Sequence, residues 1–176
     1  MAFTAQDVKA LREKTGCGMM DCKKALTEAN GDMEAAIDFL REQGLAKQAK
    51  KASRIAAEGL CSISVCGNTA AIVEVNAETD FVAKNDLFKS LVKTVADLVA
   101  ANAPANMDEA NAIKTEEGTI AELVISATAR IGEKISFRRF EKITKADDEV
   151  FGTYKHMGGK IGTVVVVKGA NEEVAK

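Results

Sequence analysis

The sequence predicts an α+β fold, in which a small helical module precedes a core of antiparallel β-hairpins packed with helices. Two observations lead to this prediction. Within residues 1–45, apolar side chains recur at helical spacing between short turns that contain glycine. From residue 59 onward, β-branched segments of strand length alternate with helical stretches and tight turns.

The composition is that of a globular protein. The chain has 176 residues, of which 47% are hydrophobic and 28% are charged, which excludes a disordered chain. The formal net charge of −2 gives no overall field that favours nucleic acid. No apolar run approaches the roughly 20 residues that span a bilayer, and residues 1–4 show no export signal. We therefore expect a cytoplasmic protein that binds no membrane.

The four cysteines predict free thiols rather than a zinc site or disulfides. Cys17 and Cys22 flank a predicted helix start, and Cys61 and Cys66 lie on a predicted strand with their side chains on opposite faces. No pair has the Cys-x-x-Cys spacing of a zinc or redox motif. Buried thiols in a reducing compartment fit this pattern better.

Three short helices are predicted in the module, residues 1–45. Thr4 opens the first helix with an acidic form of the capping box, and Gly16 ends it. The second helix covers residues 21–30. Asp32 caps the third helix, and Gly44 is expected to end it.

An alanine-rich linker helix is predicted over residues 46–58, between the module and the core. Its cations recur at positions i, i+3, i+4 and i+7 and therefore share one helix face. This basic stripe consists of Lys47, Lys50, Lys51 and Arg54. Two interpretations remain open for it: a solvated helix face, or a contact with phosphate or acidic groups.

The first core subdomain, residues 59–146, is predicted to have the order β-β-α-α-β. Gly67-Asn68 joins the first two strands as a two-residue hairpin turn. The expected elements are a strand that alternates at Cys61, Ile63 and Val65, a strand over 70–76, a helix over 86–101, a helix opened by Thr119 with Glu122 and closed by Gly132, and a strand at Ile135 and Phe137.

Residues 147–176 are expected to start a second copy of this repeat. Only the hairpin of that copy is present before the sequence ends. Strands are predicted over 150–156 and 161–167, and a helix start over 172–176. We expect this hairpin to extend the first sheet and to leave an apolar face partly exposed, formed by Val164, Val165, Val166 and Val167. Exposed β-branched strands favour association, so self-association of the chain is expected.

The stretch from Ala77 to Asn85 holds the most unusual side chain. It follows a β-branched strand and precedes a helix, so Thr79 or Asp80 is placed to cap that helix. Phe81 adds a large ring to this polar turn. Two interpretations stay open: the ring folds back onto its own helix, or it is a rigid apolar wedge offered to a partner.

No catalytic site, metal site or cofactor-binding motif is found in the sequence. His156 is the one histidine, and no nucleophile-elbow motif accompanies it. Gly159-Lys160 lacks the other residues of a P-loop, and the acidic residues are scattered among lysines without a metal-ligand pattern. We therefore expect a protein that acts by binding and is not an enzyme.

Three ordered motifs carry a family resemblance. They are Glu78-Thr79-Asp80-Phe81-Val82-Ala83-Lys84, the run from Leu11 to Leu26, and Arg130-Ile131-Gly132-Glu133-Lys134-Ile135 followed by Arg138-Arg139. All three are similar to sequences of the bacterial elongation factor Ts family, the nucleotide-exchange factors of elongation factor Tu. The resemblance implies a ubiquitin-associated-like bundle for the module. It also implies a second core half that this chain mostly lacks, and tighter partner binding by a longer chain.

The resemblance implies a guanine-nucleotide exchange factor. Such a factor binds the GTPase elongation factor Tu, disturbs its Mg²⁺ and phosphate site, and promotes GDP release during translation elongation. It favours the wedge interpretation of Phe81. Adjacent side chains at a helix start point about 100° apart, so we expect Met19 or Met20 to be exposed, the alternative being that both lie in the core. The implied partner contacts are Thr79, Asp80, Phe81, Val82, Ile131, Gly132 and His156 in the core, and Arg12, Met19, Met20 and Lys23 in the module.

Two rival functions belong to other classes. An RNA- or ribosome-binding module would use the basic stripe together with Arg138 and Arg139, although the sequence has neither an aromatic RNP1 strand nor a GXXG clamp. A steep fall of RNA affinity with salt would distinguish it. A ubiquitin-type peptide binder would use the helical module alone.

Overall fold

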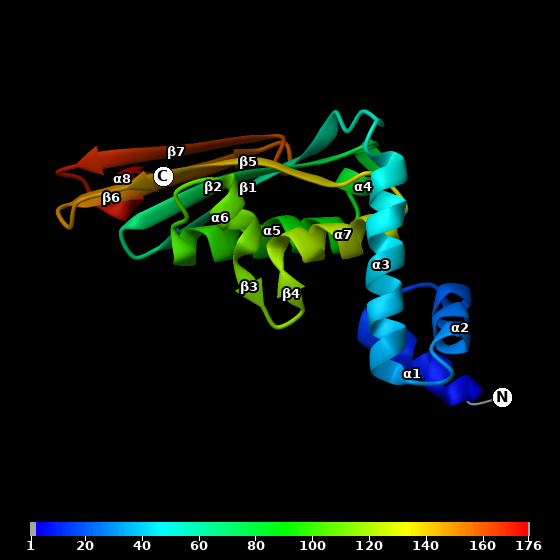
Figure 1. The fold of residues 1–176 in the computed structure, drawn as a ribbon. Coiled ribbons are helices and arrows are strands. Elements are labelled where there is room, and N and C mark those ends of the chain that lie inside the picture. The colour runs from blue at the N-terminus through cyan, green and yellow to red at the C-terminus, as the bar shows by residue number, and fades with distance from the viewer. Residues whose placement is uncertain (1–2, 176) are drawn as a thin grey trace. The chain divides into compact units, whose positions relative to one another are not determined.

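The computed structural model describes residues 3–175 and confirms the α+β class (Figure 1). The chain forms two compact units. The first unit comprises the residues up to 54 together with 125–133, and the second comprises 55–124 and the residues from 134 onward. The predicted absence of an export signal at residues 1–2 and the predicted helix end at Lys176 lie outside the described residues. The domain limits drawn from the sequence stay a prediction.

The first unit contains the three helices predicted for the module. They are α1, Ala5–Thr15, α2, Met19–Glu28, and α3, Met33–Lys51. The Thr4 backbone N–H donates to Asp7 Oδ2 at 2.7 Å, which completes the predicted capping box. Leu11, Cys22 and Leu26 are fully buried where the three helices meet.

Helix α3 does not end at Gly44, and that sequence prediction is wrong. The helix continues to Lys51, so it absorbs the first part of the predicted 46–58 linker helix. Residues 52–57 are not helical and Glu58 begins a strand, so the second part of that prediction is wrong and Arg54 lies outside the helix. Helix α7, Ile120–Ile131, explains the glycine. A Cβ at Gly44 would lie 3.1 Å from Ile125 Cγ2, so the missing side chain lets this part of α7 pack closely against α3.

The second unit is built on an antiparallel sheet of order β1-β2-β5. Helix α5 lies along one face, where Phe88, Val95 and Val99 are fully buried (Figure 1). A register shift between Glu74 and Val75 marks an irregularity in the β2–β5 pairing. The elements so far are β1, Glu58–Cys66, β2, Thr69–Ala77, α5, Asp86–Asn102, α6, Met107–Ala112, β3, Lys114–Thr115, β4, Gly118–Thr119, and β5, Ser136–Thr144.

Strand β1 turns its serine side toward the helix. Ser62 is buried, and Ser64 Oγ donates to Asp97 Oδ1 of α5 at 2.8 Å. Cys61 and Ile63 therefore occupy the opposite, outer face of the sheet. The alternation predicted a strand correctly, but both of its faces are covered, because a second layer lies on the outer face.

That second layer is the hairpin of β6, Glu149–His156, and β7, Ile161–Lys168. The prediction that it extends the first sheet is wrong, because β6 and β7 pair only with each other in the described chain. The hairpin packs on the outer face instead, where Gly162 allows a close approach. A Cβ there would lie 2.7 Å from Cys61 Sγ.

Part of the apolar face predicted for β7 remains exposed, although neighbouring residues of a strand point to opposite faces of the hairpin. Val165 and Val166 remain 44% and 37% exposed. The short helix α8, Glu172–Ala175, lies against β6, where a Cβ on Gly152 would collide with the Ala175 carbonyl oxygen. None of the described helices is long and apolar enough to cross a membrane.

Candidate partner-binding site

The Ala77–Asn85 stretch forms a turn that is capped twice. Thr79 Oγ1 accepts the Val82 N–H at 3.4 Å and opens the one-turn helix α4, Asp80–Ala83. Asn85 Oδ1 then accepts the Leu87 N–H at 2.8 Å and opens α5. These side-chain caps satisfy backbone donors that a helix start leaves open. The backbone of the turn is therefore well defined, as the cap prediction required.

Phe81 projects from this turn into solvent, with 80% of its surface exposed. The interpretation that its ring folds back onto its own helix is therefore wrong. Val82 and Ala83, the next two residues, are buried and anchor the turn. An exposed ring on a fixed backbone is unusual, because exposure gives up the burial that an aromatic side chain gains in a core.

Lys84 contacts both residues at the tip of the turn. Its Nζ pairs with Asp80 Oδ2 at 2.7 Å and lies 5.9 Å from the centroid of the Phe81 ring. The hydrogen bond from Lys84 lowers the pKa of Asp80, and the same bond raises the pKa of Lys84. Because the pKa of Asp80 is lowered, the pair stabilises the turn above the ordinary pKa of the carboxyl, and this contribution is lost as pH falls through the lowered value.

Replacing Lys84 by Met should raise the pKa of Asp80 toward its ordinary value, because the hydrogen bond that favours the charged carboxyl is removed. A carboxyl ¹³C NMR titration measures this shift. Lys89→Met is the matched control, since Lys89 pairs with Asp86 instead, at 3.5 Å. An Asp80 pKa that stays the same in Lys84→Met would contradict the pairing.

The turn of the second hairpin lies near the Asp80 turn. Lys160 forms an ion pair with Glu58 at the start of β1, and the Cys61 N–H donates to the Gly159 carbonyl at 2.7 Å. After the hydrogen bond from Lys84, the charge of Lys160 is among the causes that lower the pKa of Asp80. Residues 156–161 and the tip of α4 therefore share one charged region of the second unit.

His156 ends β6 on the exposed side of this hairpin turn. Its ring stacks on Tyr154 with the centroids 6.0 Å apart, and the Tyr154 hydroxyl lies 3.1 Å from His156 Nδ1. Both rings are exposed, as is the neighbouring Met157. An aromatic and apolar tip thus accompanies Phe81 in the same unit.

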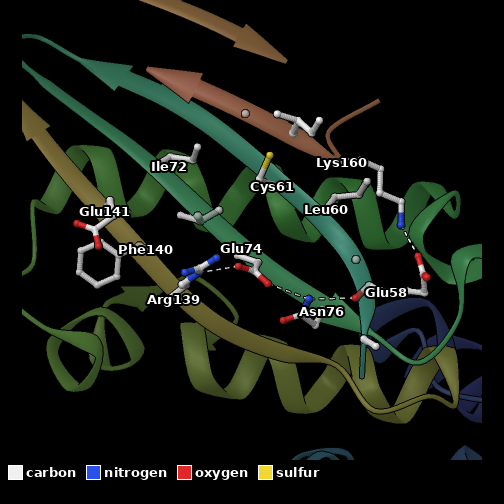
Figure 2. Close-up of a pocket in the computed structure, with 15 residues that line it drawn as sticks. Glu58, Leu60, Cys61, Ile72, Glu74, Asn76, Arg139, Phe140, Glu141 and Lys160 are labelled. Atoms are coloured by element: carbon white, nitrogen blue, oxygen red, sulfur yellow. Dashed lines mark hydrogen bonds and ion pairs between the residues drawn. The ribbon is translucent and has the colours of Figure 1, made fainter. Parts of the chain in front are cut away.

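A cleft on the outer face of the first sheet is lined by residues of β1, β2 and β5 and by residues 160–162 of the hairpin (Figure 2). At its centre, Glu74 accepts hydrogen bonds from Arg139 Nε at 2.6 Å and from Asn76 at 3.2 Å. Burial alone would raise the pKa of Glu74, but the hydrogen bonds from Arg139 and Asn76, together with the charges of Arg139 and Arg138, lower that pKa below its ordinary value. Asn76 also donates to the Glu58 carbonyl at 3.1 Å. Glu74, Arg139 and Asn76 thus pair with one another inside the cleft, and these three side chains do not single out a ligand.

Nothing in the described chain resembles a metal centre. No group of three or more His, Cys, Asp or Glu side chains is close enough to hold an ion there. All four cysteines are free thiols. Burial raises the pKa of both Cys22 and Cys61, which keeps these thiols neutral.

In the first unit, both methionines of the predicted contact are exposed. Met19 and Met20 open α2 after Gly18 and expose 46% and 74% of their surface. The alternative that both belong to the core is therefore wrong. Arg12 and Lys23 are exposed as well. Side chains that differ this much in chemistry give an adaptable surface of apolar and cationic groups.

The end of α7 supplies the remaining predicted residues of this unit. Ile131 is half-buried and Gly132 is exposed, with a φ of 89° that ends the helix in the left-handed region. Lys51 of α3 donates to the Gly132 carbonyl. The predicted contacts thus divide between the units: residues 79–82 and His156 lie in the second, and the others lie in the first.

Comparison with known proteins decides the family. The family described as Elongation factor TS matches residues 78–176, which is more than half of the chain. The chain belongs to the elongation factor Ts family. It is 60% identical over 177 aligned residues to the protein named elongation factor Ts from Lactococcus lactis subsp. cremoris strain MG1363, and equally to that from strain SK11. The alignment includes all of this chain but 52% of each relative, so the chain spans about half of their length.

The sequence motifs include Phe81, Met19 and Met20, which are exposed, but they do not show which contacts hold such residues in place. The ion pair of Lys84 with Asp80 could be predicted from the sequence, because Lys84 lies four residues after Asp80 on a helical turn. The Glu58–Lys160 ion pair could not be predicted from the sequence, since its partners are 102 residues apart. Only the packing of the hairpin on the outer face of the sheet brings those two side chains together.

Proposed function

We propose that this chain binds the GTPase elongation factor Tu and promotes the release of its GDP during translation elongation. One observation carries the proposal: Phe81 is 80% exposed on a doubly capped turn whose next two residues are buried. A rigid aromatic side chain held outside a fixed backbone can enter an apolar slot of a partner with little loss of its own entropy.

The proposed mechanism needs no active site on this chain. If the chain binds nucleotide-free GTPase more tightly than GDP-bound GTPase, linkage requires that it weaken GDP binding by the same factor. Bound Mg²⁺ demands near-ideal octahedral geometry, so a wedge that displaces a neighbouring segment of the GTPase disturbs the ion and the phosphates it holds. We propose that Phe81 is this wedge and that Asp80 contributes a charged contact beside it.

The other contacts are proposed from their family motifs, and most of them are exposed. In the second unit, Thr79 and the buried Val82 support the wedge, and His156 adds an aromatic contact. In the first unit, Ile131, Gly132 and the helical module contact the GTPase. The module residues assigned to this role are Arg12, Met19, Met20 and Lys23, all of them exposed.

Titration calorimetry against two forms of elongation factor Tu tests the proposal. We expect the nucleotide-free GTPase to bind the chain more tightly than the GDP-bound form, and excess GDP to dissociate the complex. Equal affinity for the two forms would contradict an exchange function, because a ligand with no preference shifts no equilibrium. Failure to bind either form would exclude this partner.

Replacing Met19 and Met20 together by Ala should weaken the complex mainly through faster dissociation, since interface truncations usually act on the dissociation rate. Both side chains are exposed, so the melting temperature of the free chain should stay nearly unchanged. Biolayer interferometry gives the rates, and Leu45→Ala, another exposed apolar side chain of the same unit, is the control. Binding lost only together with the fold would show that the methionines are structural.

The RNA-binding alternative receives less support from the structure. Two cations of the basic stripe make contacts within the first unit, Lys47 with Asp21 and Lys51 with Gly132. Arg138 and Arg139 both reach Glu74. The carboxylates beside Lys47, Arg138 and Arg139 offset positive charge that these side chains would otherwise offer to phosphates, and the Gly132 carbonyl engages Lys51. A cytoplasmic location follows from the proposed partner and stands as part of this proposal.

A further inference from the structure

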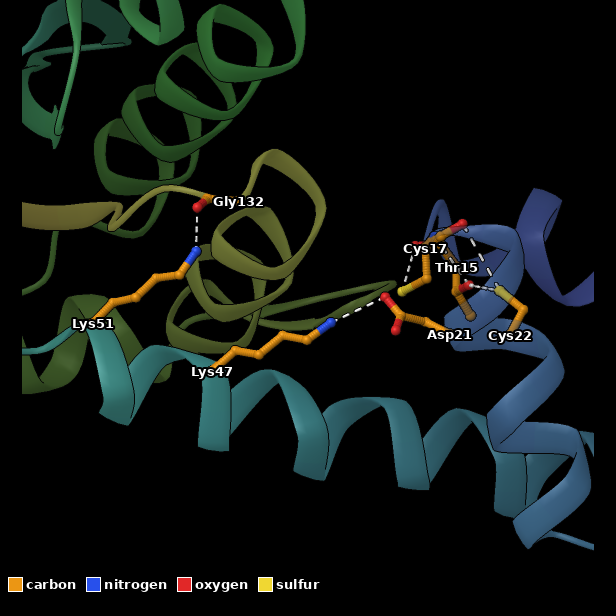
Figure 3. A network of polar contacts seen from close by, with 7 residues as sticks. All are labelled: Thr15, Cys17, Asp21, Cys22, Lys47, Lys51 and Gly132. Carbon is orange, nitrogen blue, oxygen red and sulfur yellow. Dashed lines mark hydrogen bonds and ion pairs between the residues drawn. The ribbon is translucent and has the colours of Figure 1, made fainter.

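Two lysines of the basic stripe face inward along one side of α3 (Figure 3). Lys47 Nζ lies 3.0 Å from Asp21 Oδ2, and Lys51 Nζ donates to the Gly132 carbonyl. The two lysines are four residues apart, so they lie on the same helix face, one turn after the other. Each lysine therefore reaches a different segment of the first unit from a common support.

The segments that the lysines reach are those that carry exposed candidate contacts. Asp21 stands in the first turn of α2, directly after Met19 and Met20. Gly132 directly follows Ile131 at the end of α7. A cation at the C-terminal carbonyls of α7 is favoured by the helix dipole, so the Lys51 contact stabilises that end.

Two glycines allow the same segments to pack closely against one another. Gly44 precedes Lys47 by one helical turn, and its missing Cβ admits Ile125 of α7. The Arg130 guanidinium of α7 covers Gly16 so closely that a Cβ there would lie 2.5 Å from Arg130 Cζ. Gly16 has a φ of 65° and belongs to the short loop that leads into α2. Helix α3, the start of α2 and the end of α7 are thus packed around one another.

We propose that Lys47 and Lys51 are positioning residues that hold the Met19–Met20 pair and the Ile131–Gly132 turn as one preorganised partner surface. The proposal rests on the proposed function for the identity of the partner. It assigns the basic stripe an internal role: the lysines act on the partner through the segments they fix. Fixing both segments before binding removes part of the ordering cost of association, which slows dissociation of the complex.

Amide hydrogen exchange of the free chain tests the positioning without any partner. The Gly132 N–H donates to the Thr128 carbonyl at 3.1 Å, and the Cys22 N–H donates to the Gly18 carbonyl at 3.0 Å. We expect Lys51→Met to speed exchange at Gly132, and Lys47→Met to speed it at Cys22. Lys50→Met is the matched control, because it removes the same charge from an exposed neighbour on α3 and should change neither amide.

Binding kinetics with elongation factor Tu then test the consequence. We expect Lys51→Met to speed dissociation by roughly fivefold, Lys51→Arg to restore most of the loss, and Lys50→Met to leave the dissociation rate unchanged. Equal slowing of association by Lys50→Met and Lys51→Met would show that the stripe only steers the partner, and would overturn the positioning role.

The two proposals fail separately. If the unaltered chain does not bind the GTPase, the proposed function is wrong, and the amide exchange of the free chain still decides whether the lysines fix their segments. If the unaltered chain binds but Lys51→Met and Lys47→Met match the control in both exchange and dissociation, the positioning role is wrong and the proposed function stands.

Discussion

Replacing Phe81 by Ala should reduce the stimulated release of GDP from elongation factor Tu by two orders of magnitude or so. Truncation of a buried interface anchor costs about 2–4 kcal/mol, and each 1.4 kcal/mol corresponds to a factor of about ten. The free chain should keep its fold, because the ring is 80% exposed and contributes little to the core. Stopped-flow release of a fluorescent GDP, at saturating concentrations of the chain, measures the rate.

The control for this experiment is Leu87→Ala, another exposed apolar side chain next to the same turn. It should leave the release rate nearly unchanged, because the family motif assigns it no contact. A Phe81→Ala rate equal to that of the unaltered chain would exclude the wedge. An equal loss in both variants would indicate a broad apolar contact rather than one anchor.

The largest loss of stability is expected from Gly59→Ala. Gly59 has a φ of 144°, and a Cβ there would lie 2.2 Å from the Val75 carbonyl oxygen and 2.7 Å from Asn76 Cα. Backbone atoms cannot yield as a flexible side chain can, so the β1–β2 pairing must shift. We expect a loss of about 3 kcal/mol or more in the free energy of unfolding, which is a large part of the stability of an ordinary domain.

Urea denaturation followed by circular dichroism measures that loss, and Gly67→Ala is the matched control. Gly67 also has a positive φ, 56°, but open space surrounds the position of its Cβ. The control should therefore lose only about 1 kcal/mol, from backbone strain alone. Equal losses in the two variants would show that the close contact at Gly59 is relieved without cost.

Local sequence patterns predicted the elements well, because short-range physics determines them. The Thr4–Asp7 capping box, the strands around Gly67-Asn68 and the helix from Asp86 all form near the expected residues. Gly44 shows where such patterns fail. A glycine inside a helix resembles a stop signal, but its cause is a tertiary contact with α7 that no local window contains.

The predicted position of the β6–β7 hairpin was wrong for a related reason. Its strands were predictable from β-branched alternation, but their placement depends on which surface of the first sheet is open to them. The outer face of β1 offers Cys61 and Ile63, and Gly162 fits over them. An edge and a face are equally consistent with the sequence of the hairpin, so only the packing decides between them.

The sequence predicted individual residues of the candidate site. It did not predict the long-range contacts that arrange them. Motifs located Phe81, Met19 and Met20, and all three are exposed. The ion pair of Glu58 with Lys160 joins distant parts of the chain, so local sequence patterns could not predict it. The family motifs are the basis on which these side chains are proposed as partner contacts, whereas long-range contacts determine how firmly the side chains are held.

The most direct test of the account is the rate of GDP release from elongation factor Tu as increasing amounts of the unaltered chain are added. A fluorescent GDP and a large excess of unlabelled GDP allow the rate to be followed by stopped flow. The account predicts a rate that rises with the concentration of the chain and then saturates, because release takes place from a complex of defined affinity. A rate that stays at its spontaneous value at every concentration would contradict the exchange function.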